Sequence, residues 1–384
     1  MAFQDLLLAF HASVRPERYR IITHSPTEGK VVAPFVSPFG DSRIRTWQFG
    51  LVSDEMQMIG TLLYRRLFPP TIYQALYATQ RYARRQGLTV RLKLILDRAL
   101  NQLPWEYLFD PKANQFLALE QRLAIVRHLE LPAGSLNPFA EELALALFVP
   151  GVTDRSGAPA LETGSAFSEG NADLAIPSHL RARKLSLDDL EHANGLFSNQ
   201  QILHIEAEAG RDPASGQYAL QIGVEEAAPR WVSFESVAKW LRANPTIQLV
   251  VLDASVGSGA TTREMQGLAS ALVAQQIVPA VVTLQFPIPA LLRAGFWRGF
   301  YGALARGNAL DLAMTEGRQA IAALNGVWEW GAPVLYSALR EDQPRVPADR
   351  FQTGVHVQDI LRVESFAPAS PRTVYSAKTP AAKS

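Results

Sequence analysis

The sequence predicts an α/β protein whose mainly parallel sheet is flanked by helices. Two continuous apolar runs, at residues 143–149 and 249–252, are typical of strands that are covered on both faces. Other segments, such as residues 291–304, carry apolar residues with the spacing of amphipathic helices. Because such strands and helices alternate along the chain, the sequence favours βαβ units, in which helices join parallel strands.

The N-terminal part begins with β-type runs and continues with helices. Residues 19–23 and 31–36 are short β-like segments. Between residues 55 and 86 the apolar positions have helical spacing, which is broken at Pro69-Pro70 and ends at Gly87. After this glycine every second residue is apolar, which predicts a strand containing Val90, Leu92, Leu94 and Leu96.

The second half alternates more regularly. Residues 153–179 are rich in Gly, Ala, Ser and Pro and predict a long loop. The other expected elements are a helix at 185–197, a strand at 201–208, a hairpin arm at 218–224, a helix at 232–243 capped by Ser233, a helix at 266–276, a strand at 279–285, helices at 291–304 and 309–324, and a strand at 333–339. Beyond Arg340 the chain is polar and Pro-rich, and we expect a disordered tail.

The composition excludes several classes of function. The 384 residues are 48% hydrophobic and carry 37 basic and 36 acidic side chains, so the net charge of +1 gives no global attraction for nucleic acid or an acidic membrane. The absence of cysteine excludes disulfides, thiolate zinc sites and thiol nucleophiles. The N-terminus lacks the basic start of a signal peptide, and Gln and Pro interrupt the one long uncharged stretch, at 265–292. We expect a cytoplasmic protein without a membrane span or a cofactor.

Several motifs occur in a fixed order along the chain. The run LPWEYLFDP at 103–111 is followed by FLAL at 116–119 and RLAIVR at 122–127. Further motifs are LVVLDAS at 249–255, VPAVV at 278–282 and FYGAL at 300–304. In this order, over about residues 50–340, they resemble the CHAT domain, a caspase-like peptidase family of clan CD that is related to separase. The resemblance implies a caspase-like three-layer sandwich with an N-terminal α+β subdomain.

Two predicted strands end in polar residues, and functional groups of open α/β sheets gather at such ends. The first strand end carries His204, Glu206 and Glu208, and the second carries Asp253 and Ser255. In CHAT peptidases the first strand closes with a histidine in an H-x-x-x-H-G pattern, and the second closes with a cysteine. The resemblance matches His204 to the first, non-catalytic histidine of that pattern.

Both members of the dyad are replaced under this alignment. The catalytic histidine position carries Glu208, or Ala209 if the alignment is anchored on Gly210, and the cysteine position carries Ser255. A thiol with a pKa near about 8.5 is readily deprotonated by imidazole, whereas a serine hydroxyl needs a strong, oriented base. We therefore expect no catalytic residues.

Other interpretations of these residues remain open. Ser255 is a candidate nucleophile of a divergent serine-type hydrolase, with Glu208 or Glu206 as its base. His204, Glu206 and Glu208, with Asp253 nearby, are also candidates for the site of a metal-binding regulator, although we favour a packed histidine and solvated acids without a metal. Gly257 and Gly259 lie in a loop that offers backbone N–H groups to an anion, as in a nucleotide-binding regulator. We expect Trp105 in the core, and the arginines at 81, 84 and 85 on a solvated helix face.

The organisation that we predict has four parts. These are a β-rich extension at 1–50, the N-terminal part of the CHAT-like domain at 51–140, a peptidase-type subdomain at 141–340 and the tail at 341–384. The expected function is that of a bacterial pseudopeptidase that binds a protein partner, such as an active peptidase or an effector in defence or regulated proteolysis. We expect neither nucleic acid nor a membrane as a partner.

Overall fold

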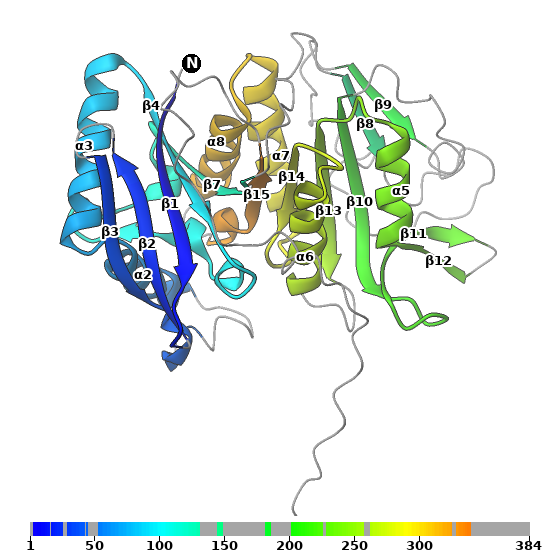
Figure 1. The fold of residues 1–384 in the computed structure, drawn as a ribbon. Helices are drawn as coiled ribbons and strands as arrows, with labels where there is room; N and C mark the ends of the chain where they lie inside the picture. Colours follow the sequence, from blue (N-terminus) through cyan, green and yellow to red (C-terminus); the bar gives the residue numbers. More distant parts are fainter. Residues whose placement is uncertain are drawn as a thin grey trace, which may run out of the picture. The chain divides into compact units, whose positions relative to one another are not determined.

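One sheet of 13 strands forms the centre of the protein (Figure 1). The computed structural model describes residues 3–15, 17–25, 29–42, 44, 53–130, 144–148, 181–185, 201–225, 228–256, 262–324 and 328–338. The strands are β1 (Phe3–Ala12), β2 (Arg18–Ser25), β3 (Gly29–Val36), β4 (Thr89–Ile95), β7 (Leu123–His128), β8 (Ala144–Phe148), β9 (Arg181–Leu185), β10 (Ile202–Arg211), β11 (Tyr218–Glu225), β12 (Ala228–Ser233), β13 (Leu249–Val256), β14 (Ala280–Leu284) and β15 (Pro333–Ser337).

The strand order is β12-β11-β10-β13-β14-β15-β7-β4-β1-β2-β3, and β8 and β9 branch from β10. The pairs β10–β13, β13–β14, β15–β7, β7–β4 and β4–β1 are parallel. At the two ends of the strand order, β10–β11–β12 and β1–β2–β3 are antiparallel, and β15 is antiparallel to β14. The sheet is therefore mixed and mainly parallel, as predicted.

Helices cover both faces of this sheet. They are α2 (Ser53–Leu67), α3 (Pro70–Gln86), α5 (Phe234–Ala243), α6 (Thr262–Ala274), α7 (Ala290–Ala305) and α8 (Leu310–Ala322). Leu203, Leu252 and other residues of one face pack against α5 and α6. Val251 and Val282 belong to the opposite face and pack with α7 and α8. Side chains of a strand alternate between faces, so each strand contributes to both layers.

Several local predictions are confirmed by the backbone. Gly87 ends α3 with a positive φ of 69°, a conformation that glycine adopts without strain. Ser233 caps α5 and accepts a hydrogen bond from the backbone N–H of Ser236. Residues 232–233 themselves end β12, so α5 begins later than the predicted helix at 232–243. Among the described residues, no helix is long and apolar enough to cross a bilayer.

β1 was not among the predicted strands, and it changes the environment of β4. Arg91 and Lys93 occupy the alternate positions of β4, yet both are buried. Asp5 of β1 pairs with Arg91 at 2.8 Å and with Lys93 at 2.6 Å, and Asp311 of α8 pairs with Arg91 at 2.9 Å. β4 is thus covered on both faces, because buried ion pairs take the place of an exposed polar face.

The sheet crosses the predicted boundaries at residues 50 and 140. β1 pairs with β4 across the first boundary, and β7 pairs with β15 across the second. The division into an extension, two subdomains and a tail stays a prediction. The predicted loop at 153–179 and the tail lie outside the described residues, and so does the predicted helix at 185–197 apart from Leu185, which ends β9.

Candidate functional site

The carboxyl ends of β10 and β13 lie next to each other, in parallel register (Figure 1). Glu206 pairs with Asp253, and Glu208 pairs with Ser255. Register partners of neighbouring strands share one face of the sheet. Ala209 pairs with Val256 and belongs to the other face. Position 208, and not 209, is therefore the one that shares a face with position 255.

His204 lies deeper in the same face of β10 and is fully buried. Its Nδ1 shares a hydrogen bond of 2.7 Å with the hydroxyl of Tyr301, and its ring meets the Trp297 ring edge-to-face at 4.8 Å between centroids. Its Nε2 lies 3.7 Å from Oδ2 of Asp253. These contacts fix the imidazole within the layer between the sheet and α7.

Asp253 is the fully buried acceptor of this cluster. Trp297 donates to its Oδ2 at 2.7 Å, and Arg293 donates to its Oδ1 at 3.2 Å. Burial alone would raise the pKa of Asp253, but the hydrogen bond from His204 and the charge of Arg293 lower the pKa below its ordinary value. Burial and the Asp253 charge raise the pKa of Tyr301, so its hydroxyl stays protonated. The cluster is a buried, charged structural unit.

Glu206 is nearly buried, and Arg293 lies between it and Asp253. The guanidinium is 3.6 Å from Oε1 of Glu206 and 3.2 Å from Oδ1 of Asp253. A cation site at these carboxylates would have to displace this arginine. Among the residues that the structure describes, no three His, Asp or Glu side chains form a group that could hold a metal ion.

Glu208 differs from His204 and Glu206 because its side chain is exposed. It lies near the carboxyl end of β10, between its register partners Ser255 of β13 and Gln221 of β11. Gly257 and Gly259 lie outside the described residues, as does the side chain of Ser255. The structure thus brings His204, Glu206 and Asp253 together and sets Glu208 apart from them.

Three residues of α7 complete the cluster and were not among the predicted site residues. Arg293, Trp297 and Tyr301 are four positions apart and therefore lie on one face of the helix. Arg293 is also the first charge after the long uncharged stretch. A charged residue followed at this spacing by two aromatic residues with polar atoms was the signal available in the sequence.

The LPWEYLFDP motif is part of the core, and Trp105 is buried as expected. Its indole N–H donates to the carbonyl of Leu100 at 2.8 Å. The next residue, Glu106, is buried too and pairs with Arg127, the last residue of the RLAIVR motif. These two motifs therefore form one structural contact.

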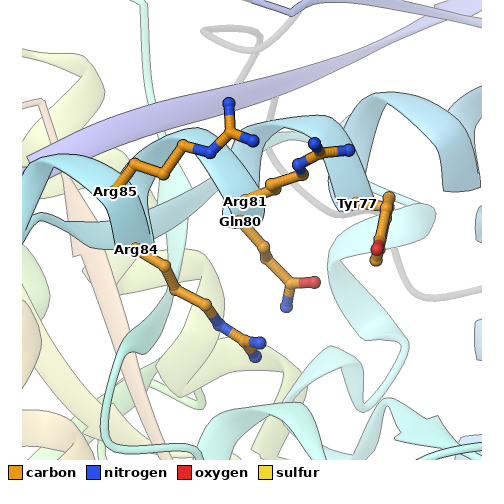
Figure 2. Close-up of a pocket in the computed structure, with 5 residues that line it drawn as sticks. All are labelled: Tyr77, Gln80, Arg81, Arg84 and Arg85. Atoms are coloured by element: carbon orange, nitrogen blue, oxygen red, sulfur yellow. The ribbon is translucent and has the colours of Figure 1, made fainter.

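Two hollows in the surface lie away from the ends of β10 and β13. One, of about 220 Å³, is lined along α3 by Tyr77, Gln80, Arg81, Arg84 and Arg85 (Figure 2). Arg84 makes a long ion pair of 3.8 Å with Glu120. The other hollow, of about 780 Å³, lies beside α7 and α8 and is lined in part by Arg122, Arg298 and Arg306. Neither hollow is lined by position 208 or 255.

Helices on both faces of a mainly parallel sheet, with polar residues at adjacent strand ends, define an α/β sandwich. The chain belongs to the CHAT domain family, whose model matches residues 57–338. It is also similar to a chain in the crystal structure of the Saccharomyces cerevisiae separase–securin complex, with 14% identity and a TM-score of 0.35. That similarity covers 71% of this chain and 17% of the other. No curated protein matches the chain.

Proposed function

We propose that this chain is a catalytically inactive CHAT protein that acts as a protein-binding, regulatory or scaffolding subunit. The observation that carries the proposal is the register of β10 and β13, which pairs Glu208 with Ser255. These are the two positions that the resemblance assigns to the catalytic histidine and cysteine. A carboxylate and a hydroxyl therefore stand where the reaction needs an imidazole and a thiol.

The chemistry of this pair supports inactivity. Glu208 is exposed to water, and a solvated carboxylate is a weak base for a serine hydroxyl. His204 precedes it by four positions, which is about 13 Å along a strand. The buried imidazole is hydrogen-bonded to Tyr301, which holds it in the layer between the sheet and α7.

A divergent serine-type hydrolase is the second candidate, since Ser255 follows a buried strand. Its base would be Glu208 or Glu206. Glu206 is nearly buried beside Arg293, and this guanidinium competes for the lone pairs that a general base would use. Neither carboxylate has the environment of an activated base, which favours the non-catalytic function.

The setting that we propose is a bacterial defence or regulated-proteolysis system, in which the partner is an active peptidase or an effector. This part of the proposal rests on the family resemblance, because function resides in sites and is not implied by a fold. An inactive relative with an intact fold retains a surface for protein partners.

Hydrolysis assays with the purified chain test the proposal. The wild type and Ser255→Ala are compared on fluorogenic peptide pools and casein, with Ser215→Ala in the β10–β11 turn as a matched serine control. We expect equal, buffer-level rates for all three and no mass increase after treatment with a fluorophosphonate. Hydrolysis that is lost only in Ser255→Ala, or a covalent adduct at that residue, would overturn the proposal in favour of the serine hydrolase.

A further inference from the structure

The two faces of the β1–β2–β3 layer differ in what covers them. Leu8, Ile21 and Phe35 are buried on the face against α2 and α3. The alternate residues belong to the other face, and in Figure 1 no helix is drawn in front of these three strands. Val32 is 49% exposed and Val36 is 43% exposed, so this face is open to solvent.

The open face has a regular pattern. Three rows of register partners cross the strands: Ala9–Ile22–Val32 in the middle, His11–Arg20–Pro34 on one side and Leu7–His24–Lys30 on the other. The middle row is entirely apolar, but Ala9 is only 2% exposed, so Ile22 and Val32 form its accessible part. Each outer row carries an imidazole and a permanent positive charge, so an apolar stripe runs between two basic borders.

Within the part of the chain that the structure describes, no acidic side chain neutralises Arg20 or Lys30 on this face. Arg20 and Lys30 are exposed, and neither forms an ion pair with an acidic side chain of the described residues. Burial, followed by the charges of Arg20 and Lys30, lowers the pKa of His11. Burial, followed by Lys30, lowers the pKa of His24. The direction of both charge effects indicates a positive potential over the face.

We propose that this face docks an acidic amphipathic helix of a partner protein, with the apolar side of the helix on the accessible Ile22 and Val32 of the middle row. The outer rows are four residues apart along a strand, which is about 13 Å. An α-helix with its side chains is about 10–12 Å wide. A helix that lies across the strands therefore places acidic residues on its two flanks over Arg20 and Lys30.

A helix fits this region better than an added strand. β3 is the last strand of the sheet, and a strand could in principle pair with its free edge. Pro34 lies within β3 and has no backbone N–H to offer, and proline is typical of edges that avoid pairing. The open face, and not the edge, is the surface on which the apolar and basic groups are arranged.

This docking surface would give the non-catalytic subunit proposed above a place to bind its partner, and its role as a partner site rests on that function. The experiment measures binding alone, so loss of binding (failure of the docking surface) and hydrolytic activity (failure of the proposed function) are separate outcomes. The probe is a fluorescent acidic peptide of about four helical turns with leucines on one face and glutamates on both flanks. A scrambled peptide of equal composition and a peptide with lysine in place of glutamate are the comparisons.

Charge reversal on the protein locates the site. Arg20→Glu/Lys30→Glu reverses the two basic borders, and Val32→Ser removes the exposed apolar residue of the middle row. Arg81→Glu/Arg85→Glu on α3 makes the same change in net charge away from the open face (Figure 2). Far-ultraviolet circular dichroism and melting temperature show that each variant is folded.

We expect the acidic amphipathic peptide to bind more tightly than both comparison peptides. Arg20→Glu/Lys30→Glu should weaken it by about tenfold or more, and Arg81→Glu/Arg85→Glu by less than about twofold. Val32→Ser removes an apolar contact and no charge, so it should weaken peptide binding and leave the salt dependence of that binding unchanged. The inference would be overturned if both charge-reversed variants lost equal affinity for the peptide. It would also be overturned if the scrambled peptide bound equally well or if no peptide bound. Tighter binding of an oligonucleotide through Arg20 and Lys30 would also overturn it.

Discussion

Arg127 and Glu106 form a doubly hydrogen-bonded ion pair in the core. Nε of Arg127 donates to Oε1 of Glu106 at 3.1 Å, and Nη2 donates to Oε2 at 2.7 Å. Each side chain is only 1% exposed. The guanidinium also donates to the carbonyls of Asn101 and Leu103, so it ties the end of β7 to the segment that leads to β5 (Phe109–Asp110). The pair explains why the two motifs occur together.

Removal of one partner of this pair should be strongly destabilising. Arg127→Met leaves the Glu106 carboxylate buried and without its cation, and the expected loss is about 3–5 kcal/mol in the free energy of unfolding. The double variant Glu106→Gln/Arg127→Met should lose less than the sum of the single losses, because both charges of the pair are removed together. Urea unfolding measures these values. A loss below about 1 kcal/mol in Arg127→Met would contradict the prediction.

Tyr301→Phe tests the cluster around His204. The change removes the hydroxyl that is bonded to Nδ1 of the buried imidazole and leaves that nitrogen without this partner. We expect a loss of about 1–3 kcal/mol in the free energy of unfolding. Tyr82→Phe, at a partly exposed position of α3, is the matched control and should change stability by less than about 0.5 kcal/mol. Equal effects of both changes would contradict the assignment of Tyr301.

A designed thiol can test the register of β10 and β13. We compare Ser255→Cys alone with Ser255→Cys/Glu208→His and with Ser255→Cys/Ala209→His. Position 208 shares a face with position 255 across a strand spacing of about 4.8 Å, and an adjacent imidazole promotes thiolate formation. Iodoacetamide should react about three- to tenfold faster at pH 6.5 only in the variant with histidine at 208. Equal acceleration by histidine at 209 would show that the register is wrong.

His128 should make stability depend on pH in the weakly acidic range. Burial, followed by the charge of Lys93, lowers the pKa of His128 to about 3. The unfolded chain has an ordinary imidazole pKa of about 6.5, so protonation favours unfolding. The contribution of the neutral His128 to the free energy of unfolding is nearly complete above pH 6.5 and is lost as the pH falls toward 3. About 2 kcal/mol is lost between pH 6.5 and 5.

His128→Gln should remove this part of the pH dependence. Asp5 and Asp253 have lowered pKa values, so their contributions are lost at lower pH, below about 4. Urea unfolding of the wild type and the variant at pH 7, 6 and 5 separates the effects. Parallel curves for the two proteins over this range would contradict a buried, neutral His128.

Local signals in the sequence determined most of the elements. The apolar run at 249–252 became β13, because a strand that is covered on both faces needs apolar residues throughout. Gly87 ended α3 through its positive φ, and Ser233 capped α5. β1 was not predicted because a charged residue such as Asp5 is unusual in a buried strand. Its presence is explained only by its ion pairs with Arg91 and Lys93 of β4.

The sequence by itself determined the family, the α/β class and the absence of a thiol at the end of β13, since these depend on residue identity and order along the chain. Only the tertiary structure decided that position 208 and not 209 faces position 255, and that Arg293, Trp297 and Tyr301 enclose His204. Strand register and helix packing join residues that are far apart in sequence, and no local propensity specifies those contacts.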